Sequence, residues 1–88
     1  MAFQVKKDFA NIFTKVVTND IYVTEENCGE IFMKCTGATN AQFKGNSTGS
    51  EYVTLAVGES FAFGYVGLPR QSFTINATGT TVEVSMSL

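Results

Sequence analysis

Apolar and polar side chains alternate with a period of two through most of residues 51–86. Successive side chains of a β-strand point to opposite faces, so this alternation predicts sheets with one buried and one exposed face. Turn-forming residues interrupt the alternation at residues 58–60, 67–69 and 76–79, where we expect the chain to reverse. The pattern therefore predicts four strands, at residues 51–57, 61–66, 71–76 and 80–86.

The first half of the chain has the same organisation in shorter runs. Strands are expected at residues 21–24, 31–35 and 41–44, and residues 45–50 read as a polar loop. Turn signals that recur about every ten residues are typical of sandwiches and barrels. We therefore predict an all-β fold, a single small antiparallel β-sandwich of jelly-roll or immunoglobulin-like type with seven or eight short strands.

Residues 9–17 fit two structures. Phe9, Ile12, Phe13 and Val16 have the spacing of one helix face, whereas the segment is also rich in β-branched and aromatic residues, which favour strands. We favour a strand, because the rest of the chain is consistently β. The predicted sandwich domain covers residues 9–88, and residues 1–8 are expected to form an N-terminal arm.

The hydrophobic core is expected on the apolar side of the alternating runs. A chain of 88 residues buries roughly 60 to 65% of the surface that its unfolded form exposes, which makes a modest core. Such a core only narrowly offsets the conformational entropy that the chain loses on folding. The predicted core residues are Val53, Leu55, Phe61, Phe63, Phe73, Ile75, Val82 and Val84, together with Ile21, Val23, Ile31 and Met33.

The two cysteines, Cys28 and Cys35, are not expected to form a disulfide. If residues 31–35 are a strand, the rise of about 3.3 Å per residue places the two Cα atoms more than about 10 Å apart. A disulfide needs a Cα separation below about 7 Å. We expect Cys35 to share a face with Ile31 and Met33 as a small buried apolar residue.

The chain contains no histidine, which argues against several kinds of chemistry. Triad catalysis needs an imidazole that accepts a proton near neutral pH, and a zinc site needs three or four Cys or His ligands. The eight acidic residues fall in predicted turns or on polar faces, which is typical of solvated surface charge. We expect a non-enzymatic protein with no metal or cofactor.

Charge and hydropathy argue against two classes of partner, nucleic acids and membranes. The formal net charge is -2 and the six basic residues are scattered along the chain, so no basic patch is expected to bind nucleic acid. No apolar run reaches the 18 or so residues of a membrane span, and the N-terminal residues do not resemble a secretory signal. Charged residues make up only 16% of the chain, against about 25% on average, which favours association with other proteins.

The sequence around Phe61, Phe63 and Tyr65 has two interpretations. Three aromatic side chains on one strand face could stack nucleic-acid bases, as in cold-shock domains, but only Arg70 lies nearby to contact a phosphate. We favour a core role, opposite Phe73 and Val84. The small residues Ala62 and Gly64 would then face outward, where a neighbouring layer or subunit could approach closely.

The segment from Tyr52 onward resembles a known family. Leu55, Gly58, Glu59 and Ser60 lead into an aromatic strand, and residues 79–84 read Gly-Thr-Thr-Val-Glu-Val. This order resembles the small β-sandwich modules of bacteriophage structural proteins, in which a Leu-x-x-Gly-Glu-Ser turn precedes an apolar strand and a Gly-Thr-Thr-Val-x-Val strand ends the chain. The resemblance covers residues 52–86. It implies a virion component: a capsid decoration, head-fibre, neck or tail protein.

We therefore expect a structural protein of a phage particle, made in the host cytoplasm and located in the virion. Its expected partners are a capsid or other virion protein and copies of itself, with a trimer as one form. One alternative is a carbohydrate- or receptor-binding module that uses Tyr22, Tyr52 or Tyr65 as a sugar-stacking surface. The second alternative is a cold-shock-like binder of single-stranded nucleic acid. The predicted interaction surface comprises Tyr22, Tyr52, Ala62, Gly64 and Arg70.

Overall fold

A computed structural model of the chain describes residues 12–24, 29–64 and 72–87. Within these residues all regular secondary structure is β-strand, so the predicted all-β fold is confirmed. The segment that fitted both a helix and a strand is a strand from Ile12 onward, whereas the predicted arm at residues 1–8 lies outside the described residues. The strands are β1 (Ile12–Thr18), β2 (Ile21–Val23), β3 (Glu30–Cys35), β4 (Ala41–Gly45), β5 (Val53–Leu55), β6 (Ser60–Gly64), β7 (Phe73–Asn76) and β8 (Thr81–Ser87).

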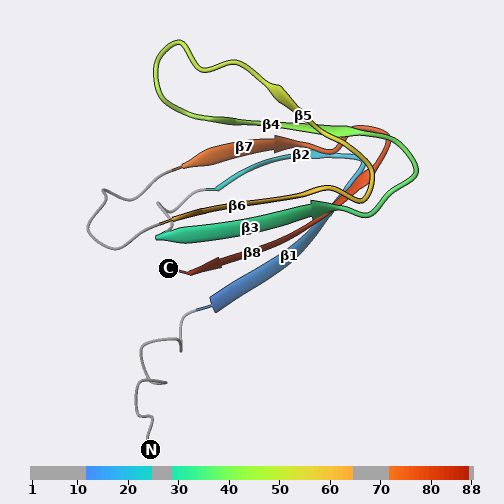
Figure 1. Ribbon diagram of the computed structural model, residues 1–88, viewed down its shortest axis with the longest axis horizontal. Helices are drawn as coiled ribbons and strands as arrows, with labels where there is room; N and C mark the ends of the chain where they lie inside the picture. The colour runs from blue at the N-terminus through green and yellow to red at the C-terminus, as the bar shows by residue number, and fades with distance from the viewer. Residues whose placement is uncertain (1–11, 25–28, 65–71, 88) are drawn as a thin grey trace, which may run out of the picture.

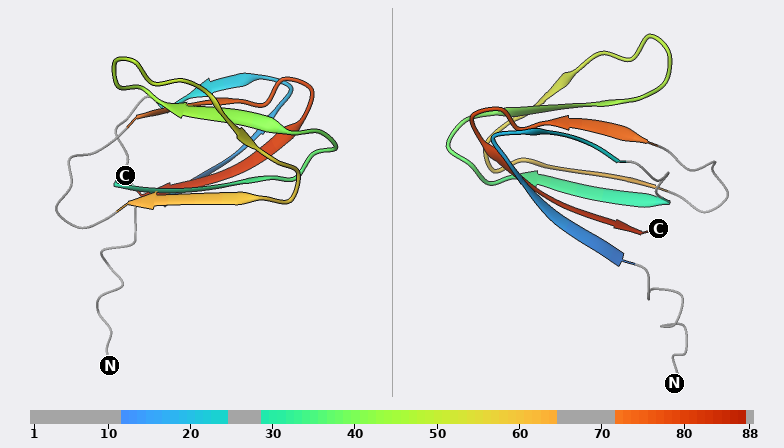
Figure 2. Two further views of the ribbon diagram at one scale, coloured as in Figure 1. Left: turned by 45° about the horizontal axis from the view of Figure 1, so that its top comes forward. Right: turned by 180° about the vertical axis from the view of Figure 1, so that it is seen from behind.

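The strands form two four-stranded sheets that pack face to face (Figures 1 and 2). Sheet A has the order β1-β8-β3-β6, and sheet B has the order β2-β7-β4-β5. β1 pairs with β8, β2 with β7, β3 with β6 and β4 with β5, all antiparallel. These four pairs are those of one long hairpin with β4 and β5 at its tip. The hairpin is rolled up on itself, and this brings β3 beside β8 and β4 beside β7. Of the two predicted sandwich types, the strand order is that of a jelly roll.

The core lies between the two sheets and is built from alternate residues of each strand, as the period-two pattern predicts. Met33, Ile75 and Val82 are fully buried, and Ile31, Leu55, Phe73 and Val84 are nearly so, which confirms these seven predicted core residues. Cys35 is also buried as expected, and its thiol donates a hydrogen bond to the backbone oxygen of Thr39 at 3.2 Å. Cys28 lies outside the described residues. The core also contains Val17, Ala41, Phe43, Ala77 and Met86.

The prediction that Ile21 and Val23 are core residues is wrong. Both side chains are about half exposed, because the register of β2 against β7 places Tyr22 beside the buried Ile75 and turns its two neighbours outward. Thr24 is buried on the same side as Tyr22, and its hydroxyl accepts a hydrogen bond from the Phe73 backbone N–H at 2.9 Å. Since β2 carries large side chains at all three positions, the alternation does not define its inner face.

Val53 and Phe63 are also more exposed than predicted. Val53 is 52% exposed and Phe63 is 40% exposed, although each shares the inner face of its strand with a buried or half-buried neighbour. The reason is position, because β5 and β6 are edge strands of different sheets and side chains at an edge are covered from fewer sides. Phe61 is half-buried against the core, with its ring centroid 4.5 Å from that of Phe43.

Hydrogen bonds tie the four tight turns together at one end of the sandwich (Figure 1). The Asn19 backbone N–H donates to the Thr80 backbone oxygen at 2.9 Å, and the Asn19 side chain accepts from the Gly79 N–H at 2.9 Å. The Thr80 hydroxyl donates to the backbone oxygen of Thr39 at 2.6 Å, and the Val57 N–H donates to the Asn40 side chain at 3.0 Å. No buried side-chain polar atom among the described residues lacks a partner. These contacts fix how the two sheets sit on each other.

Candidate functional site

Sheet A turns one face away from the core, and we call this surface the outer face of sheet A. Because the four strands pair in register, its side chains form rows that run across the strands in the order β1, β8, β3 and β6. The first row is Ile12, Ser87, Glu30 and Gly64; the second is Thr14, Ser85, Phe32 and Ala62; the third is Val16, Glu83, Lys34 and Ser60.

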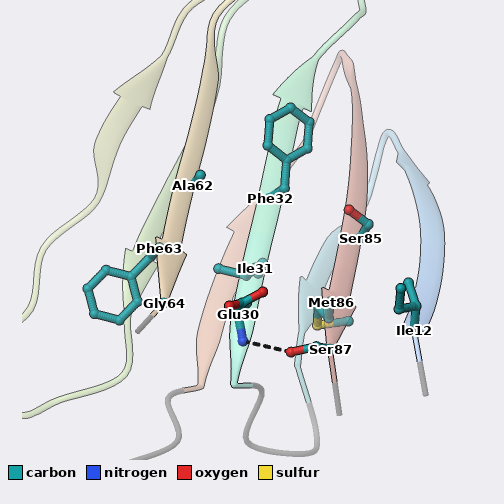
Figure 3. Close-up of a pocket in the computed structure, with 10 residues that line it drawn as sticks. All are labelled: Ile12, Glu30, Ile31, Phe32, Ala62, Phe63, Gly64, Ser85, Met86 and Ser87. Atoms are coloured by element: carbon teal, nitrogen blue, oxygen red, sulfur yellow. Dashed lines mark hydrogen bonds between the residues drawn. The ribbon is translucent and has the colours of Figure 1, made fainter. Parts of the chain in front are cut away.

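Phe32 stands between two hollows on this face. The first hollow, of about 320 Å³, is bounded by Phe32, Ala62, Ser85 and Ile12 among its lining residues, and Figure 3 shows Phe32 on β3 between Ala62 on β6 and Ser85 on β8. The second hollow, of about 340 Å³, lies between Phe32 and β1 and is bounded by Val16 and Ser85. Phe32 and Ser85 border both hollows, so a large projecting side chain lies directly beside a small one.

The floor of the first hollow is held by contacts within the chain. The Ser87 hydroxyl accepts a hydrogen bond from the Glu30 backbone N–H at 3.1 Å (Figure 3). Gly64 has a φ of 151°, and a Cβ atom at this position would lie 2.8 Å from the Glu30 Cα atom. Gly64 is therefore required by the close approach of β6 to β3, and its lack of a side chain also keeps this end of the hollow open.

The outer face of sheet A combines exposed apolar side chains with a small set of charges. Ile12, Val16 and Phe32 are 55%, 61% and 44% exposed. Lys34 and Glu83 lie opposite each other in the third row. A surface of this composition can bind another protein through apolar contact, with the charges fixing the orientation. Among the described residues, no cluster of three or more His, Cys, Asp or Glu side chains could hold a metal ion.

The structure places the predicted interaction residues on different surfaces. Ala62 and Gly64 lie on the outer face of sheet A and line the first hollow. Tyr22 is half-buried on the inner side of β2, with the Lys15 Nζ atom 5.1 Å from its ring centroid. Tyr52 precedes β5, and the Lys44 Nζ atom lies 5.1 Å from its ring centroid.

Tyr22 and Tyr52 do not form a shared aromatic surface, because they lie on or beside strands that are far apart in sheet B. β2 and β5 are the opposite edges of sheet B, so Tyr22 and Tyr52 do not lie side by side. Neither tyrosine joins Ala62 and Gly64, which belong to sheet A. Tyr65 and Arg70 lie outside the described residues.

The aromatic strand β6 directs its phenylalanines inward. The ring centroids of Phe61 and Phe63 lie 6.4 and 6.0 Å from that of Phe73, and both pairs are edge-on. Phe61 also packs against Phe43. These contacts agree with the core role that we favoured for the two residues, with Phe63 at the exposed margin of the cluster.

The sequence pattern did not single out Phe32, Ile12 and Val16 as surface residues. Phe32 carried a signal, because it occupies the outward position between Glu30 and Lys34, where alternation calls for a polar side chain. Ile12 and Val16 lie in the segment for which the sequence fitted both a helix and a strand, and only the strand shows that they share a face.

Comparisons with known proteins identify no family for the chain. No protein-family model matches it, and no curated protein matches it. One similar solved structure is the solution NMR structure of a de novo designed double-stranded β-helix, with a TM-score of 0.49 and 19% sequence identity, covering 89% of this chain and 97% of that chain. The part of the chain that the structure describes contains no helix that is long and apolar enough to cross a membrane.

Proposed function

We propose that this chain is a non-enzymatic structural protein of a virus particle, a capsid decoration or other virion assembly component that binds protein surfaces by shape. The observation that carries the proposal is the exposed outer face of sheet A, on which Phe32 projects between two hollows. Exposed apolar patches that are bordered by polar residues mark protein-binding sites in soluble proteins. Ile12 and Val16 extend this patch across β1.

The edges of the two sheets support the same kind of function. β1 and β6 are the outer strands of sheet A, and β2 and β5 are the outer strands of sheet B. Strands at a sheet edge have backbone groups that can pair with another chain. Since a sheet face carries exposed apolar side chains and each sheet has two edge strands among the described residues, association with a larger protein surface and with copies of the chain, a trimer included, is expected.

The viral assignment depends on two further observations. Residues 52–86 resemble the small β-sandwich modules of phage structural proteins, and the rolled-hairpin topology is an architecture that viral capsid proteins use. The same architecture also occurs in lectins and cupins, so the topology alone does not choose the function. The resemblance favours the viral function among these, and with it a location in the virion after synthesis in the host cytoplasm.

Density-gradient sedimentation of particles tests this proposal. Particles assembled in cells that express the chain are separated from soluble protein, and the chain is followed with an antibody. Wild-type chain is expected in the particle band, and the Phe32→Glu variant is expected to move to the soluble fractions. Val23→Glu is the matched control, because Val23 has a similar exposure but lies on the outer side of sheet B.

Recovery of the wild-type chain in the soluble fractions alone would remove the viral proposal. Equal displacement by Val23→Glu and Phe32→Glu would remove the outer face of sheet A as the contact surface. A chain that stays soluble and binds purified cell-wall polysaccharide would instead be a carbohydrate-binding module.

A further inference from the structure

We infer that the outer face of sheet A binds a second copy of this chain, with a two-fold axis that runs parallel to the strands between β8 and β3. The inference rests on the proposed function, because it names the protein that occupies the proposed contact face. A two-fold axis in this position lays the two faces against each other and keeps each row opposite the same row of the second copy. β3 of each copy then faces β8 of the other, and β6 of each copy faces β1 of the other.

Side-chain sizes match across this axis. Phe32 of one copy lies over Ser85 of the other, where the two hollows meet. At the outer strands, Ile12 faces Gly64 in the first row. In each of these pairs a large side chain meets a small one, which allows two sheets to pack at a spacing of about 10 Å.

The charges of the third row also match. Lys34 on β3 lies over Glu83 on β8 of the second copy, and the same contact repeats on the other side of the axis. The two pairs form a closed square of alternating charges, since Lys34 and Glu83 are also neighbours within each chain. Opposite charges that face each other across an interface favour the orientation that brings them together.

A two-fold axis that runs across the strands would also stack these faces, and the structure disfavours it. That axis would also place a charge opposite Lys34, because Glu30 lies one row beyond Phe32 on the same strand. However, it would place Phe32 directly over Phe32 of the second copy and would leave the hollows beside it unfilled. The axis parallel to the strands seats each phenylalanine beside a hollow.

The size of the face sets the expected affinity. Four strands at about 4.8 Å and three outward residues along each strand make a face of roughly 19 by 20 Å, which is about 400 Å². Stable interfaces bury about 800 Å² on each partner. The face offers half of that area, so we expect a weak dimer that is strengthened wherever the chain is concentrated on a lattice.

Charge reversal in two separate variants tests the inference. Lys34→Glu places four acidic groups in the third row of a homodimer, and Glu83→Lys places four basic groups there. Each variant alone is expected to dimerise about tenfold or more weakly than the wild type in sedimentation equilibrium at low salt. An equal mixture of the two is expected to form a heterodimer of near wild-type affinity, because each copy then faces its opposite charge.

Three controls make every outcome decisive. Circular dichroism and thermal unfolding establish that each variant is folded. Mixing two variants cannot restore the lost contact between Lys34 and Glu83 within one chain, so any recovery of affinity reports contacts between chains. Lys44→Glu makes the same change in net charge on sheet B and is expected to leave dimerisation unchanged. A mixture of Lys34→Glu with Glu30→Lys tests the axis that crosses the strands, because only that axis would place the two changed residues opposite each other and restore dimerisation.

Recovery in the mixture with Glu83→Lys supports the inference. Recovery only with Glu30→Lys, or a wild-type chain that stays monomeric up to about 1 mM, overturns it. If self-association fails but Phe32→Glu still removes the chain from particles, the face binds a different protein and the proposed function stands. If the dimer forms but the chain is absent from particles, the viral proposal fails alone.

Discussion

Phe32 on β3 and Ser85 on β8 lie directly opposite each other and both point away from the core. A large side chain beside a small one gives sheet A its projection and its two hollows. Ser85→Leu is expected to fill the space that the second copy's phenylalanine needs. The variant should lose self-association in sedimentation experiments while its free energy of unfolding changes by less than about 0.5 kcal/mol, as is usual at the surface. A Ser85→Leu dimer of wild-type affinity would contradict the seating of Phe32 over Ser85.

Phe43 and Phe63 belong to the same aromatic cluster but differ in exposure. Phe43 is 8% exposed and Phe63 is 40% exposed. Phe43→Ala is expected to lower the free energy of unfolding by about 3–5 kcal/mol, because it leaves a cavity in the core. Phe63→Ala is expected to cost about 1–2 kcal/mol, because much of that ring already contacts water. Denaturant unfolding of the two variants measures both values, and equal losses would contradict the exposure of Phe63.

The buried hydroxyl of Thr24 satisfies a backbone group of β7. It accepts from the Phe73 N–H at 2.9 Å, and Thr24 is 2% exposed. Thr24→Val keeps the shape but leaves that N–H without its partner, so the free energy of unfolding should fall by about 1–3 kcal/mol. Thr24→Ser, which keeps the hydroxyl, is the control and should lose less. Thermal unfolding compares them, and a Val variant as stable as the Ser variant would refute the role of this hydrogen bond.

Gly37 lies against the start of β8. A Cβ atom at this position would come within 2.5 Å of the Thr81 backbone nitrogen, which cannot move without disturbing the paired strands. Gly37→Ala is expected to lower stability by about 1–3 kcal/mol. Gly45→Ala is the matched control, because its Cβ atom would meet nothing closer than the Ser50 Oγ atom at 3.9 Å. Calorimetry measures the melting temperatures of both variants. Equal melting temperatures would contradict the close contact between Gly37 and the residues Thr80 and Thr81.

The sequence predicted the strands well wherever one face of a strand is clearly apolar. The alternation of Ile31, Met33 and Cys35, and of Val82 and Val84, identified strands and buried faces together. It was less informative at sheet edges. The inward positions of Val53 and Phe63 follow the pattern, but their exposure depends on how far neighbouring strands extend over them, which is a long-range property.

Two further features could not be derived from local pattern. The choice between a jelly roll and an immunoglobulin-like order depends on which distant strands pair, such as β1 with β8, and alternation is the same in both. The outer face of sheet A brings together β1, β8, β3 and β6, which are separated along the chain. Ala62 and Gly64 were predicted to face outward, but local alternation cannot show that Phe32 lies beside them.

Amide NMR spectra of the wild-type chain, recorded over a range of concentrations, test the proposed contact face most directly. Resonances of residues on the outer face of sheet A, with Phe32, Ser85 and Lys34 foremost, are expected to shift as the concentration rises, while those of Ile21 and Val23 on sheet B stay constant. Shifts confined to sheet B or to the edge strand β5, or spectra that do not change with concentration, would contradict it.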